Sequence, residues 1–311
     1  MKKITFILRN YGMFIGFALI FLIFSLSSEY FLDVYNLMNI LVQSSLIAII
    51  AVGQTFVILT GGIDLSVGSI VALTSVGSGL MLVSGVPIPI AILLGILIGV
   101  GAGVVNGMTI AFGKVPAFIV TLGMMSIARG GALALNNGKP VSGLPFEFER
   151  IASTEIFGIP IFAIYMGVVF AIGFFILYKT RLGRHIFAIG GNREATKLSG
   201  INVPFNEMMA YAISGLLAGL GGVLLTARLN YATPISGNAY ELDTIAAVVI
   251  GGTSLAGGEG GLLGTLIGAL LLGTLRNGLT LLNVVSYYQQ IIIGSVIILA
   301  VFYDRMKTKK G

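Results

Sequence analysis

The feature that most constrains this chain is a series of long apolar segments, each near the length of a membrane-crossing helix. Such a helix needs about 20 apolar residues, and on this criterion we count about ten segments. They lie near residues 11–28, 38–60, 66–83, 90–112, 116–136, 160–178, 208–227, 242–256, 262–282 and 287–303. The third and eighth are short and glycine-rich, so either is a candidate for a broken helix. The pattern predicts an all-α polytopic membrane protein with about ten transmembrane helices in one domain, 1–311.

The composition agrees with a lipid environment and excludes several kinds of site. Hydrophobic residues make up 56% of the chain and charged residues 10%, whereas a soluble domain carries roughly 25% charged residues. The chain has no cysteine and one histidine, His185, which excludes disulfides, thiolate metal sites and multi-histidine metal sites. The basic residues lie between apolar segments and not on one soluble face, so the net charge of +6 does not indicate a nucleic-acid partner.

The distribution of basic residues predicts the orientation, because cytoplasmic loops are enriched in lysine and arginine. With an even number of spans, one side collects Lys2, Lys3, Arg9, Lys114, Lys179, Arg181, Arg184, Arg193, Lys197, Arg305, Lys307, Lys309 and Lys310. The opposite side collects Glu29, Asp33, Glu147, Glu149, Glu155, Glu241 and Asp243. We therefore expect both termini in the cytoplasm, with the N-terminal apolar segment retained as the first span.

Two parts of the chain resemble each other. Asn106-Gly107-Met108-Thr109 closes the fourth span and Asn277-Gly278-Leu279-Thr280 closes the ninth, while Ile63-Asp64 and Leu242-Asp243 open the third and eighth. Spans 2–5 and 7–10 therefore read as two copies of one unit. An odd number of spans separates them, so the copies run in opposite directions, as in transporters built from inverted repeats.

The longest basic loop, about 179–207, has the signals of a short helix. Asn192 is a good N-cap, Glu194 lies in the first turn and Gly200 can end the helix. These signals predict a helix at about 193–199, outside the membrane. Such a helix is typical of a docking element for a cytoplasmic partner. The alternative is an ordinary basic loop that contacts no partner.

Four stretches carry a resemblance to a known family: residues 57–68, the Gly190-Gly191-Asn192 turn, residues 240–249 and residues 251–258. With these stretches, the chain resembles the permease subunit of bacterial binding-protein-dependent ABC sugar importers from about residue 30 onward. Glu194-Ala195-Thr196 followed by Gly200 also resembles the start of the general importer coupling motif, from which Thr196 departs. The resemblance implies that the predicted helix contacts an ATPase subunit through Arg181, Arg184, Gly190, Gly191, Asn192, Glu194, Ala195 and Gly200.

The same resemblance implies the other parts of the assembly. Two permease copies would form the pore in the bacterial inner membrane, and an extracytoplasmic sugar-binding protein would close on the outer loops, mainly 136–159 and 228–241. No phosphate-binding loop of the form Gly-x-x-x-x-Gly-Lys-Ser/Thr occurs in the sequence, so we expect no cofactor in this chain, with ATP and magnesium bound by the separate ATPase subunit. The implied substrate is a monosaccharide, ribose or another pentose.

Polar residues within the predicted spans are candidates for the translocation path or a gate. They are Gln43, Gln54, Thr55, Asp64, Ser66, Asn106, Ser126 and Arg129. Most have an alternative interpretation as helix-packing contacts. For Asp64 and Asp243 we favour helix N-caps, for Arg129 a pairing with a carboxylate or carbonyl, and for Arg276 a side chain that reaches the membrane surface.

An ion-coupled secondary sugar transporter is the alternative function. Such carriers usually place acidic or histidine relays in mid-span, whereas here the carboxylates lie mostly at predicted span ends and no span contains a histidine. A membrane enzyme finds no support, since the sequence contains neither a nucleophile elbow nor a metal-binding motif. We therefore expect a non-catalytic membrane subunit.

Overall fold

The computed structural model describes residues 2–308 of the chain, with the side chains described for residues 13–299 and Phe302. Lys309 and Lys310, counted above among the basic residues, lie outside the described residues. The described part is almost entirely helical. Its elements are α1 (Lys2–Ser27), α2 (Val34–Leu59), α3 (Val67–Val83), α4 (Ile88–Ala111), α5 (Ala117–Leu135), α6 (Phe146–Ser153), β1 (Glu155–Ile156), β2 (Ile159–Pro160), α7 (Ile161–Lys179), α8 (Arg181–Gly191), α9 (Arg193–Leu198), α10 (Val203–Leu229), α11 (Tyr240–Ile250), α12 (Leu262–Leu281) and α13 (Ser286–Thr308).

The helices confirm an all-α membrane protein. Within residues 2–308, six helices are long and apolar enough to cross a membrane: α2, α4, α5, α7, α10 and α12. Shorter apolar helices lie at Met13–Ser27, Val67–Val83 and Ser286–Leu299. The expectation of a span at 242–256 is wrong as a full crossing, because α11 has 11 residues and a helix of that length covers only about 16 Å. The 242–256 segment is instead a half-helix followed by a loop.

Several local elements differ from the sequence-based expectations. The seventh predicted span begins five residues earlier than expected, at Val203, where the Asn202 side chain accepts from the Phe205 N–H and Pro204 lies in the first turn. This combination is a strong helix start. The long basic loop contains α8 as well as the expected α9, and the 136–159 loop contains α6 and part of a small β1–β2 hairpin.

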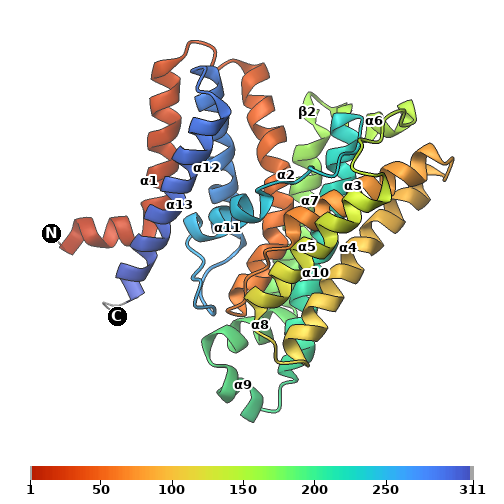
Figure 1. The fold of residues 1–311 in the computed structure, drawn as a ribbon. Helices are drawn as coiled ribbons and strands as arrows, with labels where there is room; N and C mark the ends of the chain where they lie inside the picture. Colours follow the sequence, from red (N-terminus) through yellow and green to blue (C-terminus); the bar gives the residue numbers. More distant parts are fainter. Residues whose placement is uncertain (1, 309–311) are drawn as a thin grey trace.

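The short elements lie at opposite ends of the helix bundle (Figure 1). We call the end formed by residues 180–202 the α9 end, and the end formed by residues 136–160 the α6 end. The chain enters α1 and leaves α13 on the side of the α9 end, while the α1–α2 and α12–α13 connections lie on the side of the α6 end (Figure 1).

Glycines bring the helices of the bundle close together. A Cβ at Gly99, Gly103 or Gly107 of α4 would overlap backbone atoms of α10, at Gly215 and Met208 among others. The regular glycine spacing of α4 is therefore a packing surface, as small residues are in membrane helix pairs. On the other side of the molecule, α12 packs in the same way on α11, through Gly264 against Gly251 and Gly268 against Ala247.

Two helix breaks occupy the centre of the molecule. After α2, Gly61 takes a positive φ of 83° and residues 62–66 lead to α3. After α10, Asn230 has a φ of 55° and residues 231–239 lead to α11. The starts of α3 and α11 meet, because a Cβ at Gly68 would overlap the Glu241 carboxylate and the Gly237 carbonyl. The two broken helices therefore face each other through their N-terminal ends.

Candidate functional site

The α8–α9 segment, residues 180–202, is built from local capping interactions. Thr180 caps α8 by accepting from the Gly183 N–H at 3.5 Å, and Asn192 caps α9 by accepting from the Ala195 N–H at 2.9 Å. Gly200 follows α9 with a φ of 79°, a conformation that glycine adopts without strain. The predicted 193–199 helix is thus present, and its start and end use the residues that predicted it.

Most of the α8–α9 segment faces away from the bundle. Among the predicted coupling residues, Arg181, Arg184, Gly191, Asn192, Glu194, Ala195 and Gly200 are exposed, and Gly190 is half-buried. Ile186 and Ile189 of α8 and Thr196 of α9 are buried. Leu198, at the end of α9, is 87% exposed. Its apolar side chain is a contact candidate that the sequence analysis did not single out, because helical patterning alone does not show which leucine lacks a neighbour.

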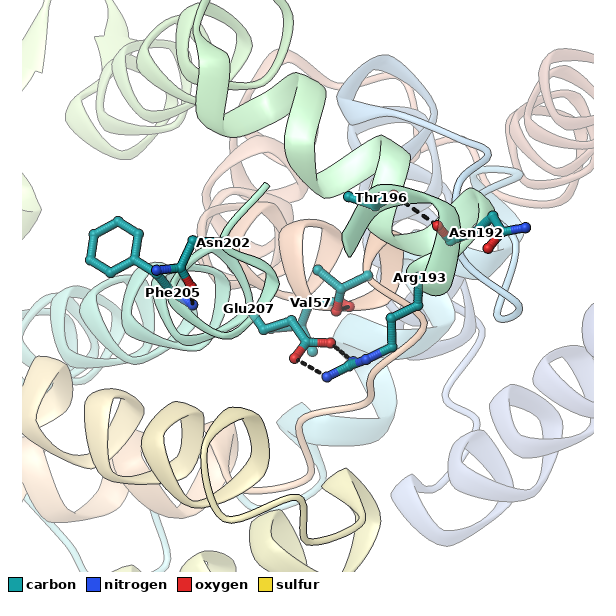
Figure 2. Close-up of polar contacts among 8 residues, drawn as sticks. Val57, Asn192, Arg193, Thr196, Asn202, Phe205 and Glu207 are labelled. Atoms are coloured by element: carbon teal, nitrogen blue, oxygen red, sulfur yellow. Dashed lines mark hydrogen bonds and ion pairs between the residues drawn. The ribbon is translucent and has the colours of Figure 1, made fainter. Parts of the chain in front are cut away.

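An ion pair fixes α9 to the start of α10 (Figure 2). Arg193 donates to both carboxylate oxygens of Glu207, with Nη2 at 2.8 Å from Oε2. The Arg193 side chain is 49% exposed and that of Glu207 5%. A second polar contact joins α8 to α10, between His185 Nδ1 and Asn206 Oδ1 at 3.1 Å. A displacement of α9 would therefore act directly on the first turns of α10.

A glycine contact, which we call the glycine seam, joins α8 to the first helix break and to the α11–α12 loop. It consists of Gly190, the Leu59 carbonyl, Gly61, Gly257 and Gly258. A Cβ at Gly190 would overlap the Leu59 oxygen and the Gly258 nitrogen, and the Gly258 N–H donates to the Leu59 oxygen at 3.0 Å. The α11–α12 loop, the end of α2 and the end of α8 therefore meet at backbone distance. The Gly257–Gly261 turn therefore packs closely on its neighbours.

A cavity of about 770 Å³ opens beside the seam. Its charged lining residues are Lys114, Arg193, Glu194, Lys197 and Glu207. Thr60, Gly61, Gly62 and Tyr211 also line it. The cavity lies between the α2 break, the start of α10 and α9, so this end of the molecule has both a hollow and an exposed short helix.

Four of the predicted path residues come together in a buried cluster, which we call the Asp64 cluster. Asp64 Oδ1 accepts from the Ser66 N–H at 2.9 Å and the Ser66 hydroxyl at 2.6 Å, and Oδ2 accepts from Ser214 of α10 at 2.9 Å. Asn106 of α4 donates to the Ser66 hydroxyl at 2.9 Å. The amide of Gln54, oriented to satisfy both of its polar atoms, pairs with the Asp64 backbone at 3.3 Å.

All members of the Asp64 cluster are fully buried, so they join helices in this conformation and line no cavity. The N-cap interpretation of Asp64 is wrong, because the N-cap position of α3 belongs to Ser66. The N-cap interpretation of Asp243 is wrong as well, because α11 begins at Tyr240 and Asp243 pairs with Arg276. In both cases the carboxylate contacts a side chain far away in the sequence, Ser214 for Asp64 and Arg276 for Asp243, and does not occupy the N-cap position of its helix.

The remaining path candidates have three different surroundings. Thr55 is buried and shares a 2.7 Å hydrogen bond with Thr265 of α12. Ser126 is exposed on α5 and donates to the Leu122 carbonyl of its own helix. Arg129 donates to the carbonyls of Pro234 and Ser236, which confirms the expected pairing with carbonyl groups and holds the 231–239 segment against α5.

Gln43 is the path candidate that lines a cavity, which we call the Asp243 pocket. This pocket has a volume of about 200 Å³ and lies among α2, α10, α11, α12 and α13. Its polar lining residues are Gln43, Arg228, Tyr240, Asp243 and Arg276, and its apolar ones include Ile47, Leu272 and Ile293. The sequence analysis named Asp243 and Arg276 individually and missed Arg228, because nothing in the sequence places these side chains around one hollow.

Among residues 13–299, no group of three or more histidine or acidic side chains is arranged to hold a metal ion.

Comparison with known proteins gives a consistent result over nearly the whole chain. The model of the family described as branched-chain amino acid transport system / permease component matches residues 36–301. The chain is 47% identical over 311 residues to the ribose import permease protein RbsC of Bacillus subtilis (strain 168), which covers 99% of this chain and 97% of that protein. It is 48% identical over 294 residues to RbsC of Escherichia coli (strain K12), covering 93% and 91%. It is 42% identical over 302 residues to the D-allose transport system permease protein AlsC of that strain, covering 96% and 93%. No solved structure matches the chain.

Proposed function

Because this chain belongs to the family of branched-chain amino acid transport system permease components, we propose that it is the membrane subunit of an ATP-binding-cassette importer for a monosaccharide. The observation that carries the proposal is the similarity to sugar permeases along nearly the full length of both chains. Three ribose permeases are 46–48% identical, whereas the D-allose permease is 42% and a xylose permease 34% identical. This order favours ribose as the substrate. Nothing in the described structure favours an ion-coupled carrier.

The charges support an orientation with the α9 end in the cytoplasm. Lys114, Lys179, Arg181, Arg184, Arg193 and Lys197 all lie at this end, near the entry to α1 and the exit from α13. Glu147, Glu149 and Glu155 lie at the α6 end. The positive-inside rule then assigns the α6 end to the outside, where a sugar-binding protein would deliver the substrate.

Helix packing supports the inverted repeat. If α2, α3, α4 and α5 correspond to α10, α11, α12 and α13, the contacts of one unit recur in the other. Four of these contacts are α2–α12, α2–α11, α3–α4 and α3–α5. Exchanging each helix for its counterpart gives, in the same order, α10–α4, α10–α3, α11–α12 and α11–α13. All eight pairs are in contact. Opposed units of this kind place a pathway where they meet.

In this assembly α9 would be the element that the ATPase subunit contacts. Its exposed surface includes Glu194, Lys197 and Leu198, and the Arg193–Glu207 pair and the glycine seam connect it to α10, to α2 and to the α11–α12 loop. The ATPase subunit would bind ATP and magnesium, a second copy of this chain would complete the pore, and a sugar-binding protein would act outside. Movement of α9 would then act on the first helix break, on the start of α10 and on the α11–α12 loop.

ATP-driven uptake of radiolabelled ribose into vesicles tests this function. The chain would be co-expressed with its ATPase and binding protein, as the wild type and as Glu194→Arg, which reverses a charge on the exposed face of α9. We expect uptake that needs ATP and both partners and that falls at least about tenfold in the variant, the factor that corresponds to roughly 1.4 kcal/mol.

The matched control is Glu29→Arg, the same charge reversal at an exposed position in the α1–α2 connection, outside the loops that we expect the binding protein to contact. It should leave uptake dependent on the ATPase and near the wild-type rate, provided that membrane assembly is equal for all three forms. Ribose uptake by the chain alone, driven by an ion gradient and unchanged by Glu194→Arg, would overturn the importer proposal.

A further inference from the structure

The Asp243 pocket contains more polar groups than its internal contacts use. Arg276 Nη2 donates to both carboxylate oxygens of Asp243 at 3.0 Å. A guanidinium group has five N–H donors, and the other three of Arg276 make no hydrogen bond within the described part of the chain. The same holds for the side-chain polar groups of Gln43, Arg228 and Tyr240 over residues 13–299. The Arg228 guanidinium carbon lies 6.0 Å from the centre of the Phe162 ring, but donors from four helices still face one small hollow without hydrogen-bond partners.

A neighbouring contact between the same two helices shows what a purely structural pair looks like. Asn36 of α2 and Asn277 of α12 donate to each other at 3.1 and 2.8 Å, and Asn36 also donates to the Phe31 carbonyl. Both are buried, and neither lines a described cavity. If the Asp243–Arg276 pair served only to join α11 to α12, it would need neither the hollow nor Gln43, Tyr240 and Arg228 around it.

Ionisable groups among membrane-spanning helices are costly to place, and Asp243 is only 5% exposed. A cluster of ionisable groups at such a place is therefore a candidate binding site. The apolar lining residues Ile47 and Leu272 lie beside the polar ones, a combination that suits a ligand with both hydroxyl and C–H faces. The volume of about 200 Å³ is below the roughly 300–1,000 Å³ of sites for drug-sized ligands, as expected for a small molecule.

We propose that the Asp243 pocket binds the vicinal hydroxyl groups of a monosaccharide on its way through the membrane. This inference rests on the proposed function, and it assigns the sugar contacts to a single chain. Asp243 would accept from one hydroxyl while Arg276 donates to its neighbour, since a carboxylate accepts and a guanidinium donates. Gln43 and Tyr240 would bind further hydroxyls. Two arginines and one carboxylate line the pocket, so an anionic sugar is the competing ligand that the test includes.

Saturation-transfer NMR tests the pocket on the full, unsubstituted chain in lipid nanodiscs. Ribose should give a saturable signal that empty nanodiscs lack. The analogue 2-deoxyribose lacks the 2-hydroxyl and therefore both vicinal pairs that include it. It should bind at least about tenfold more weakly, as expected for a lost hydrogen bond to a charged group. An equal signal from both sugars, no signal above that of empty nanodiscs, or a signal from ribose 5-phosphate alone would overturn the proposal.

Two variants locate the signal. Gln43→Leu should remove most of it, and this change breaks no described hydrogen bond, so it tests the pocket even if Asp243→Asn fails to fold. The matched control is Thr109→Leu, the loss of a polar side chain that is exposed on α4 and bonds only within its own helix, which should leave the signal unchanged. A signal that survives Gln43→Leu at full strength contradicts the assignment. ATP-driven uptake separates the two proposals: intact uptake without the NMR signal refutes only the pocket.

Discussion

The two aspartates that follow the helix breaks have opposite surroundings. Asp64, after α2, is fully buried and its carboxylate accepts hydrogen bonds from Ser66 and Ser214. Asp243, after α10, is 5% exposed and pairs with Arg276, whose side chain is 40% exposed, beside a cavity of about 200 Å³. The network at the first break uses both carboxylate oxygens of Asp64 and leaves Asn106 Oδ1 without a hydrogen-bond partner. The pocket at the second break leaves several donors without one.

This difference separates a structural use of a buried acid from a functional one. In the inverted-repeat interpretation the two aspartates occupy corresponding places, so the same sequence signal has two outcomes. The Asp64 cluster joins α3, α4 and α10, and opening it would expose three donors at once. The Asp243 pocket can exchange its contacts with a ligand, because several of its donors are not committed to the protein. The first break should therefore govern stability more than the second.

The largest effect should come from Asp64→Ala. The Ser66 N–H and the hydroxyls of Ser66 and Ser214 would lose their acceptor, and each buried donor left unpaired costs about 1–3 kcal/mol. We expect a loss of about 3 kcal/mol or more in the free energy of unfolding, measured by thermal unfolding of the purified chain. Asp64→Asn keeps an acceptor oxygen and should lose less.

The control for this prediction is Ser126→Ala, at an exposed position whose hydroxyl bonds only within α5. Its unfolding should match that of the wild type. If Asp64→Ala unfolds at the wild-type temperature, the cluster does not hold the first break together, and the contrast with Asp243 fails.

A smaller effect should follow Gly190→Ala, which acts on the first break from the α9 end. The added methyl group would overlap the Leu59 oxygen and the Gly258 nitrogen, and overpacking of this kind costs about 1–3 kcal/mol. Gly167→Ala on α7 is the matched control, because a Cβ there meets nothing within 4 Å. Ribose uptake per ATP hydrolysed should fall in the first variant and stay near the wild-type value in the second.

Equal behaviour of the two alanine variants would show that the glycine seam does not transmit the movement of α9. A parallel fall of uptake and ATP hydrolysis in Gly190→Ala would indicate general damage to the fold, whereas a fall in their ratio identifies loss of coupling. The ratio is therefore the measurement that distinguishes the seam from simple packing.

Local chemistry explains what could be predicted from the sequence. Asn192, Glu194 and Gly200 act within a few residues of each other, so the sequence alone located α9. The apolar segments likewise located the long helices, because lipid imposes their length. The start of α10 was missed, although Asn202 and Pro204 provide a signal for it, because the apolar pattern begins later in the chain.

The remaining features depend on partners distant in the sequence. Gly190 looks like any glycine until Leu59 and Gly258 lie against it. Asp64 is a residue type that favours helix caps, but its carboxylate accepts a hydrogen bond from Ser214, 150 residues away. Gln43, Arg228 and Asp243 come from three helices, and no spacing rule predicts that they share a hollow. The sequence therefore predicts helices and caps, whereas sites formed between helices require the packing.

The smallest effect on stability should come from Arg276→Met, the change that removes the cation from Asp243. Removing one member of a fully buried ion pair costs roughly 3–5 kcal/mol, but Arg276 is 40% exposed and the pocket beside Asp243 still contains Arg228 and Gln43. We therefore expect a loss of about 1 kcal/mol or less in the free energy of unfolding, the range of partly exposed pairs, in the same unfolding assay as Asp64→Ala.

Ribose uptake should nevertheless fall in Arg276→Met. Arg276→Lys, which keeps the charge but not the fork of donors, should restore stability more fully than uptake. A loss in Arg276→Met as large as that in Asp64→Ala would mean that Asp243 closes its break as Asp64 does, because only an acid without alternative partners depends so strongly on one cation.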